Sequence, residues 1–176
     1  MDEASAWFRQ GVADRLAAER FAGDNDTETR CHAIAKWQQT VEKCVKAIVA
    51  ALRMAGVLHI EIGYGHKAAR FIDVLIRLPH AVKHRAVQQE LRRLLDGRTR
   101  AGIVALDALA PRRPPPGQLP TRNTEYPFQD AAANWTYPAS AGVFSQEETQ
   151  RFRALAHRIV EGVGRITSAI RRRPRD

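Results

Sequence analysis

Residues 32–55 read HAIAKWQQTVEKCVKAIVAALRMA, and this stretch decides the fold. Its apolar residues recur at steps of three and four, which places them on one face of a long helix. They are Ile34, Trp37, Val41, Cys44, Val45, Ile48, Leu52 and Ala55. We predict that this helix is capped by Asp26 and ends at Gly56.

Amphipathic segments of the same kind lie on both sides of this helix. The spacing of three and four recurs over residues 4–22, 67–78 and 82–109, and Asp96-Gly97 predicts a kink or a split in the last of them. No strand is predicted anywhere in the chain. The fold class is therefore all-α, an up-and-down bundle of about five helices that spans residues 1–176 as a single domain.

A proline-rich loop is expected from residue 110 to residue 144, because this stretch holds most of the nine prolines. Its aromatic residues predict that part of the loop packs on the bundle or seals a dimer. They are Tyr126, Phe128, Trp135 and Tyr137. Ser145-Gln146-Glu147-Glu148 is a capping box, which predicts that the final helix begins there. That helix ends near Arg171, and residues 171–176 form a basic tail.

The charge balance favours a polyanionic partner. There are 28 Lys and Arg against 19 Asp and Glu, which gives a net charge of +9. Most of the basic residues are arginines, which suit bidentate contacts with phosphate. Residues 92–93, 98–100 and 112–113 and the tail are the candidate RNA contacts, and solvated helix faces are the alternative interpretation.

Composition also bears on ligands and compartment. Cys31 and Cys44 have no ligand-type spacing, so we expect two buried thiols, with no disulfide, no metal and no cofactor. No run of about eighteen apolar residues occurs. The first residues also lack the basic segment of a signal peptide. We therefore expect a cytoplasmic protein with no membrane partner.

Two runs in the first half of the chain resemble HEPN domains, the nucleotide-binding family of higher eukaryotes and prokaryotes. Residues 7–19, WFRQGVADRLAAE, are similar to the opening of that family, and residues 32–47 to its second helix. Gly65-His66 followed by residues 71–75 is similar to its third helix. Thr124-Glu125-Tyr126-Pro127 resembles its "RYP" element, with Glu125 in the place of arginine.

This resemblance implies an all-α bundle, often a homodimer, that belongs to a prokaryotic defence or toxin-antitoxin module. Many members are encoded beside a nucleotidyltransferase. Active members are metal-independent ribonucleases with an R-x(4–6)-H motif, and no histidine follows Arg122 at that spacing. Arg151 and His157 match the motif formally. Six residues along a helix rotate by about 600°, so the His157 side chain points about 240° away from that of Arg151. The two side chains could therefore act on one phosphate only if a dimer partner supplied one of them.

A polar stripe on the second helix is a candidate binding site. Gln39, Glu42, Lys43 and Lys46 follow one another at helical spacing. Lys43 and Lys46 could line a phosphate pocket. Alternatively, Glu42 and Lys46 form an i, i+4 ion pair within a solvated face.

Three further residues are candidates for nucleotide or RNA binding. His66 could contact a phosphate or cap the third helix. Arg122 could clamp a phosphate and Tyr126 could stack on a base. The alternative is that the Tyr-Pro corner docks the loop on the bundle.

The sequence therefore predicts a non-catalytic nucleotide- or RNA-binding HEPN-like subunit, which forms a homodimer and works with a nucleotidyltransferase or another effector. One alternative is a HEPN endoribonuclease whose site forms across the dimer from Arg151 or Arg122 with His157. Another is a structural adaptor whose basic surface meets an acidic protein.

Overall fold

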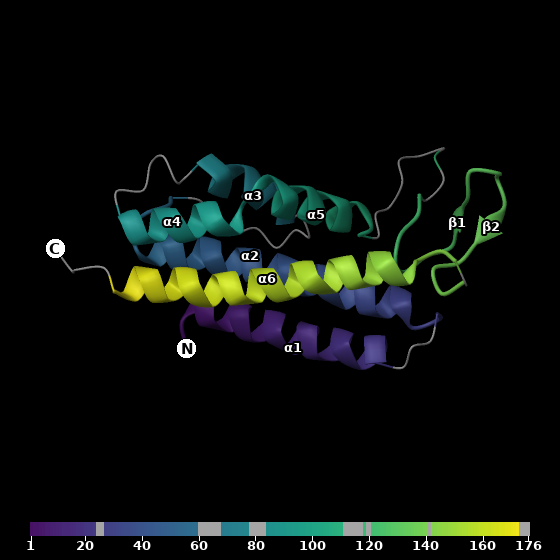
Figure 1. Cartoon of the computed structure of the whole chain (residues 1–176), viewed down its shortest axis with the longest axis horizontal. Helices are drawn as coiled ribbons and strands as arrows, with labels where there is room; N and C mark the ends of the chain where they lie inside the picture. Colours follow the sequence, from purple (N-terminus) through teal and green to yellow (C-terminus); the bar gives the residue numbers. More distant parts are fainter. Residues whose placement is uncertain are drawn as a thin grey trace.

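The chain folds into a bundle of helices with one small hairpin at its end. The computed structural model describes residues 1–23, 27–59, 68–77, 84–110, 118, 121–140 and 142–172. The elements are α1 (Glu3–Gly23), α2 (Arg30–Met54), α3 (Ala68–Arg77), α4 (Arg85–Leu94), α5 (Gly97–Ala108), β1 (Phe128–Gln129), β2 (Trp135–Thr136) and α6 (Gln146–Arg171). The prediction of an all-α bundle is confirmed (Figure 1).

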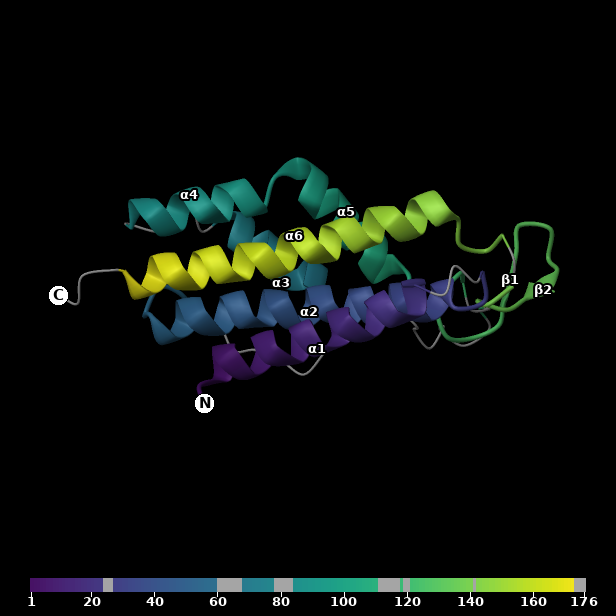
Figure 2. The same cartoon turned by 60° about the horizontal axis from the view of Figure 1, so that its bottom comes forward.

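Helix α2 lies at the centre of the bundle. It packs against α1, α3, α5 and α6, and α1 and α6 run beside it along the long axis in both views (Figure 2). Seven of the eight residues predicted for its apolar face are buried, and Ala55 is half-buried. Burial continues on its other faces, where Ala33, Ala47, Val49 and Ala50 are inaccessible to solvent.

The start of α2 differs from the prediction. The N-cap residue is Thr29, so the predicted cap at Asp26, a residue outside the described ranges, is wrong. The Thr29 side chain makes no capping hydrogen bond, and its hydroxyl donates instead to the carbonyl of Phe21 at 2.9 Å. This bond ties the end of α1 to the start of α2. At the other end, Gly56 has a φ of 67°, which terminates the helix as predicted.

The predicted break at Asp96-Gly97 is a complete split between two helices. Asp96 is the N-cap of α5, and its side chain accepts a hydrogen bond from the backbone N–H of Thr99 at 2.7 Å. Its second carboxylate oxygen accepts from Arg158 on α6, also at 2.7 Å. One residue thus caps α5 and holds it to α6, and the described residues form six helices where about five were predicted.

At its closest approach to α2, helix α1 presents the small residue Gly11, and this contact corrects part of the predicted apolar face of α1. The periodicity assigns Leu16 and Phe21 to that face, yet they are 50% and 36% exposed. The buried residues are Ala4, Gly11, Asp14 and Ala18. A Cβ on Gly11 would lie 2.8 Å from the sulfur of Cys44, so the two helices approach too closely there for a larger residue.

The segment before α6 contains a hairpin that the sequence did not predict. Phe128 pairs with Thr136 and Gln129 with Trp135 in antiparallel register. The carboxylate of Asp130 closes the turn by accepting from the backbone N–H groups of Ala132 and Asn134, each at 2.9 Å. Residues 121–140 otherwise form no helix, as predicted for this loop.

The stability that Asp96 contributes should depend on pH. The hydrogen bond from the Thr99 backbone, aided by the Arg158 guanidinium, holds the pKa of the Asp96 carboxyl below its ordinary value of 3.8. A carboxyl with a lower pKa in the folded state adds stability above its unfolded pKa, and loses it as pH falls through the folded pKa. Asp96→Ala should therefore cost about 1 kcal/mol of unfolding free energy at pH 7. That cost should shrink below about pH 4.

Thermal melts between pH 7 and pH 2.5 measure this effect. Asp73→Ala is the matched control, because Asp73 is an exposed partner of Arg100 and caps no described helix. The control should change stability little. A difference between Asp96→Ala and wild type that stays constant down to the lowest pH would contradict the prediction.

Two glycines of α6 should respond oppositely to substitution by alanine. A Cβ on Gly162 would lie 2.5 Å from a methyl carbon of Leu94 on α4, whereas a Cβ on Gly164 has no described atom within 4 Å. Gly162→Ala should destabilise the protein by roughly 1–3 kcal/mol. Gly164→Ala should stabilise it by up to about 1 kcal/mol, because alanine favours a helix. Denaturant unfolding of both variants is the measurement, and equal effects of the same sign would show that α4 and α6 do not meet at Gly162.

Candidate functional site

Two residues of the predicted polar stripe on α2, Glu42 and Lys46, are buried, whereas Gln39 and Lys43 are half-buried. Lys46 and Glu42 are each 1% exposed, and the Lys46 ammonium donates to a carboxylate oxygen of Glu42 at 2.8 Å. Lys43, whose side chain is 17% exposed, donates to the same oxygen at 3.0 Å. The structure therefore contains the i, i+4 ion pair of the alternative interpretation, within the interior and not on a solvated face.

The ring of Trp7 on α1 covers both lysines. The Lys46 ammonium lies 4.7 Å from the ring centroid and that of Lys43 lies 5.7 Å from it. Cations over an aromatic face are attracted by the ring quadrupole, more strongly when they are desolvated. Lys46 is thus held by Glu42 and Trp7 and has almost no surface to offer a phosphate.

The buried ion pair should show strong coupling in a double-mutant cycle. Glu42→Leu should cost about 3 kcal/mol of unfolding free energy, because it leaves the buried Lys46 ammonium without its carboxylate. Lys46→Met in the same chain should restore most of that loss, since it removes the stranded charge. Urea unfolding of the two single variants and the double variant measures the coupling. A double variant whose loss equals the sum of the single losses would mean that the pair is not coupled.

Arg122 attaches the loop to the start of α6. Its guanidinium donates to the Glu148 carboxylate at 2.6 Å and to the carbonyl of Val143, and it lies 4.4 Å from the ring centroid of Phe144. The Ser145 hydroxyl accepts from the backbone N–H of Glu148 at 3.0 Å, which confirms the predicted N-cap. In a capping box the glutamate side chain reaches back to the N-cap backbone, whereas here the Glu148 carboxylate binds Arg122. In this structure Arg122 therefore holds the loop against the start of α6, and its guanidinium is occupied by these contacts.

Asn123 and Tyr126 form the corner that follows Arg122. The buried Asn123 side chain accepts from the backbone N–H of Tyr126 at 2.7 Å and donates to the Tyr126 carbonyl at 3.1 Å. This bonding fixes a tight turn. The ring of Tyr126 is 55% exposed, so it remains open to stacking on a ligand. His66, the third predicted contact of this kind, lies outside the described residues.

Arg151 and His157 are held by different neighbours on α6. Arg151 is exposed and lies 5.0 Å from the ring centroid of Phe152. The Nε2 atom of His157 lies 2.7 Å from a carboxylate oxygen of Glu19 on α1. Among the described contacts none joins Arg151 to His157. Within one chain, the structure does not bring the formal R-x-H pair together.

Glu19 forms a small charged cluster with His157 and Arg153. Arg153 donates to the Glu19 carboxylate from the Nε atom at 3.2 Å, and its Nη2 lies 2.5 Å from the other oxygen. Partial burial raises the pKa of the Glu19 carboxyl, but the hydrogen bonds from His157 and Arg153 outweigh it and the pKa lies below its ordinary value of 4.5. The cluster joins α1 to α6.

The two cysteines are free and buried, which confirms the prediction of two buried thiols. Burial raises the pKa of the Cys44 thiol to about 12, so it stays protonated and unreactive at neutral pH. The described residues contain no group of three or more His, Cys, Asp or Glu side chains placed to hold a metal ion. None of the described helices is long and apolar enough to cross a membrane.

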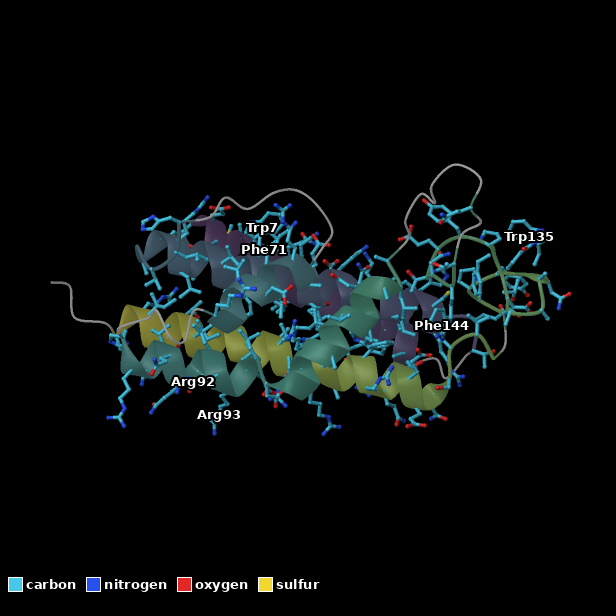
Figure 3. All side chains as sticks on the ribbon, turned by 90° about the horizontal axis from the view of Figure 1, so that it is seen from above. Trp7, Phe71, Arg92, Arg93, Trp135 and Phe144 are labelled. Carbon is cyan, nitrogen blue, oxygen red and sulfur yellow. The ribbon has the colours of Figure 1, made fainter. Side chains whose placement is uncertain are left out.

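Exposed arginines gather on α4 and on the C-terminal half of α6, two helices that pack together. We call this surface the α4–α6 arginine face. Its members are the exposed Arg85, Arg92, Arg93 and Arg172 and the half-exposed Arg165. Figure 3 shows Arg92 and Arg93 projecting from α4 away from the body of the bundle.

Carboxylates compensate this face only in part. Arg165 pairs with Glu90 at 3.0 Å and with Glu161 at 3.7 Å. Arg93 is 72% exposed and only 3.9 Å from Glu90, at the limit of an ion pair. The described carboxylates form no ion pair with Arg85, Arg92 or Arg172. The face therefore presents several guanidinium groups that have no ion-pair partner among the described carboxylates.

Sequence reasoning finds only part of this face. Residues 92–93 and the tail are candidate RNA contacts by their runs of arginine, whereas Arg85 and Arg165 stand outside such runs. Arg85 precedes Arg92 by seven residues, about two helical turns, so the signal that places it on the same face is present. The approach of Arg165 depends on how α6 packs on α4, which has no local signal in the sequence.

Comparisons of the chain with family models, with curated proteins and with solved structures find no match. The fold and the surface together define an all-α helical bundle with a basic face on α4 and α6. The HEPN resemblance stays a prediction from the sequence.

Proposed function

We propose that this chain is a non-catalytic nucleotide- or RNA-binding bundle that holds phosphates on the α4–α6 arginine face. The observation that carries the proposal is the set of exposed arginines without a described carboxylate partner, led by Arg85 and Arg92. A guanidinium presents a planar fork of donors that matches phosphate oxygens, and each neutralised phosphate releases counterions.

The position of this face supports an extended ligand more than a single small anion. It runs over two neighbouring helices, and Arg165 bridges them through Glu90. The net charge of +9 adds long-range attraction for a polyanion. Together with the HEPN resemblance, this supports a subunit of a prokaryotic defence or toxin-antitoxin module that forms a homodimer and works with a nucleotidyltransferase or another effector.

The surroundings of His157 favour binding over catalysis. A general acid or base must reach the ribose or the leaving oxygen directly, and the Nε2 atom of His157 is engaged by Glu19. Arg151, the formal partner, contacts Phe152. An endoribonuclease site would require a second copy of the chain to bring its own arginine to His157.

The α4–α6 arginine face should dominate RNA affinity and its salt dependence. The variant Arg92→Gln/Arg93→Gln should weaken binding of a labelled single-stranded RNA. It should also lower the slope of log affinity against log salt by about 0.7 for each phosphate that the variant no longer neutralises. Fluorescence anisotropy at several salt concentrations measures both quantities, and thermal melting confirms that the variant is folded.

The matched control is Arg9→Gln/Arg20→Gln on α1, which removes the same charge from two exposed arginines far from α4 in sequence. It should leave the salt slope unchanged. If both double variants lose affinity alike, the effect is one of net charge and not of a defined face. Wild-type protein that does not bind RNA or mononucleotides at low salt would refute the proposal.

A further inference from the structure

A second feature of the structure, at the hairpin end of the bundle, is a cleft of about 580 Å³. Its walls come from the last turn of α1, the first half of α2 and the segment between residues 124 and 139. Figure 1 shows that the β1–β2 hairpin, the end of α1 and the start of α2 lie at this same end. The volume falls within the range of sites that bind small molecules.

Helix α2 contributes a regular wall to this cleft. Cys31, Ala35 and Gln39 follow at steps of four, and His32 and Lys36 form the next row, so all five lie along one side of the helix. Because this part of α2 is a continuous helix anchored in the core, the wall is rigid. The opposite wall is the segment that Arg122 and Asn123 hold in place.

Aromatic rings stand on two sides of the cleft. Phe21 at the end of α1 contacts the ring of His32, with 5.6 Å between the ring centroids. Tyr137 follows β2 on the other side and is 57% exposed. Flat rings on different walls of one cleft are suited to stacking on a planar ligand.

The charges of the polar groups in the cleft nearly cancel. The Lys36 ammonium donates to the Gln39 side-chain oxygen at 2.8 Å and lies 3.5 Å from the Asp14 carboxylate, which offsets its charge. Glu125 brings an exposed carboxylate to the rim. An anion would meet Glu125, and a cation would meet Lys36, so an uncharged ligand suits the cleft best.

Thr124 supplies an independent sign that a ligand belongs here. It lines the cleft and is 2% exposed. Its hydroxyl oxygen has no hydrogen-bond partner in the part of the chain that the structure describes. Buried hydroxyls are almost always paired, so an unpaired one beside a cleft indicates a partner outside the described residues, and a ligand in the cleft can be that partner. The amide nitrogen of Gln39 and the carboxylate of Glu125 add a donor and an acceptor at the same place.

We propose that this cleft binds an uncharged heteroaromatic molecule of one or two rings, stacked between Tyr137 and the Phe21–His32 pair. The hydrogen-bonding edge of the ligand meets Thr124, Gln39 and Glu125. This site goes beyond phosphate binding, because it shares no residue with the α4–α6 arginine face and lies at the other end of the bundle.

Calorimetric titration of the full chain with defined probes tests the ligand class. Adenine and nicotinamide are uncharged heteroaromatic probes at neutral pH, benzoate is an anionic ring and benzyltrimethylammonium a cationic one. At least one of the two neutral probes should bind saturably with a stoichiometry of one, and the charged rings should bind at least tenfold more weakly or not at all. Absence of saturable binding by both neutral probes, or stronger binding of a charged ring, would overturn the proposal.

Matched variants then test the location. Tyr137→Ala should reduce the affinity for the bound probe roughly tenfold because it removes the stacking ring. Trp135→Ala should leave the affinity unchanged, because Trp135 is equally exposed on the same hairpin but does not line the cleft. Thr124→Val keeps the side-chain shape and should reduce affinity about fivefold because it removes one hydrogen bond. Equal losses for Tyr137→Ala and Trp135→Ala would overturn the assignment to this cleft.

Measuring RNA binding and probe binding on both sets of variants distinguishes the cleft proposal from the proposal for the α4–α6 arginine face. Tyr137→Ala should bind RNA as the wild type does, and Arg92→Gln/Arg93→Gln should bind the neutral probe as the wild type does. Either proposal can therefore be refuted without affecting the other. A variant at Tyr137 that loses both ligands while melting at the wild-type temperature would show that the cleft is a part of the RNA surface and not a separate site.

Discussion

Helix α2 is buried around most of its circumference, so α1, α3, α5 and α6 must each meet it with a surface that fits. On the α1 side the fit requires small residues, because a Cβ at Gly11 would collide with the sulfur of Cys44. On the same side it also requires that Glu42 and Lys46 neutralise one another, since neither charge has access to water. The ring of Trp7 on α1 covers Lys43 and Lys46 and completes this interface. The rest of the bundle is arranged around a helix whose exposed residues, His32 and Met54, lie near its two ends.

Much of the fold follows from local signals in the sequence. The period of three and four residues identifies the helices, Asp96-Gly97 marks the split between α4 and α5, and Ser145 caps α6. These features depend on a few neighbouring residues. The hairpin has no such signal, because strands of two residues are too short to show an alternating pattern.

The candidate site is harder to predict because it depends on contacts between distant residues. A periodicity argument assigns a charged stripe to solvent, whereas α1 covers Glu42 and Lys46 and turns them into core residues. The same argument assigns Leu16 and Phe21 to the core, although a close helix contact through glycine and alanine leaves them exposed. Arg122 is held by Glu148, a residue 26 positions away, and no local spacing reveals that bond. Lys46 is buried and Lys43 is engaged by Glu42, so we propose the exposed arginines of α4 and α6 as the surface for phosphate.

Mapping RNA on the folded chain by backbone NMR tests this account most directly. On addition of a short single-stranded RNA, the account predicts amide shift changes in α4 and in the C-terminal half of α6, around Arg92 and Arg165. The amides around Lys43 and Lys46 in α2 should not move, because these lysines are engaged beneath Trp7. Shift changes centred on α2 and on residues 122–126, with α4 unaffected, would contradict the account.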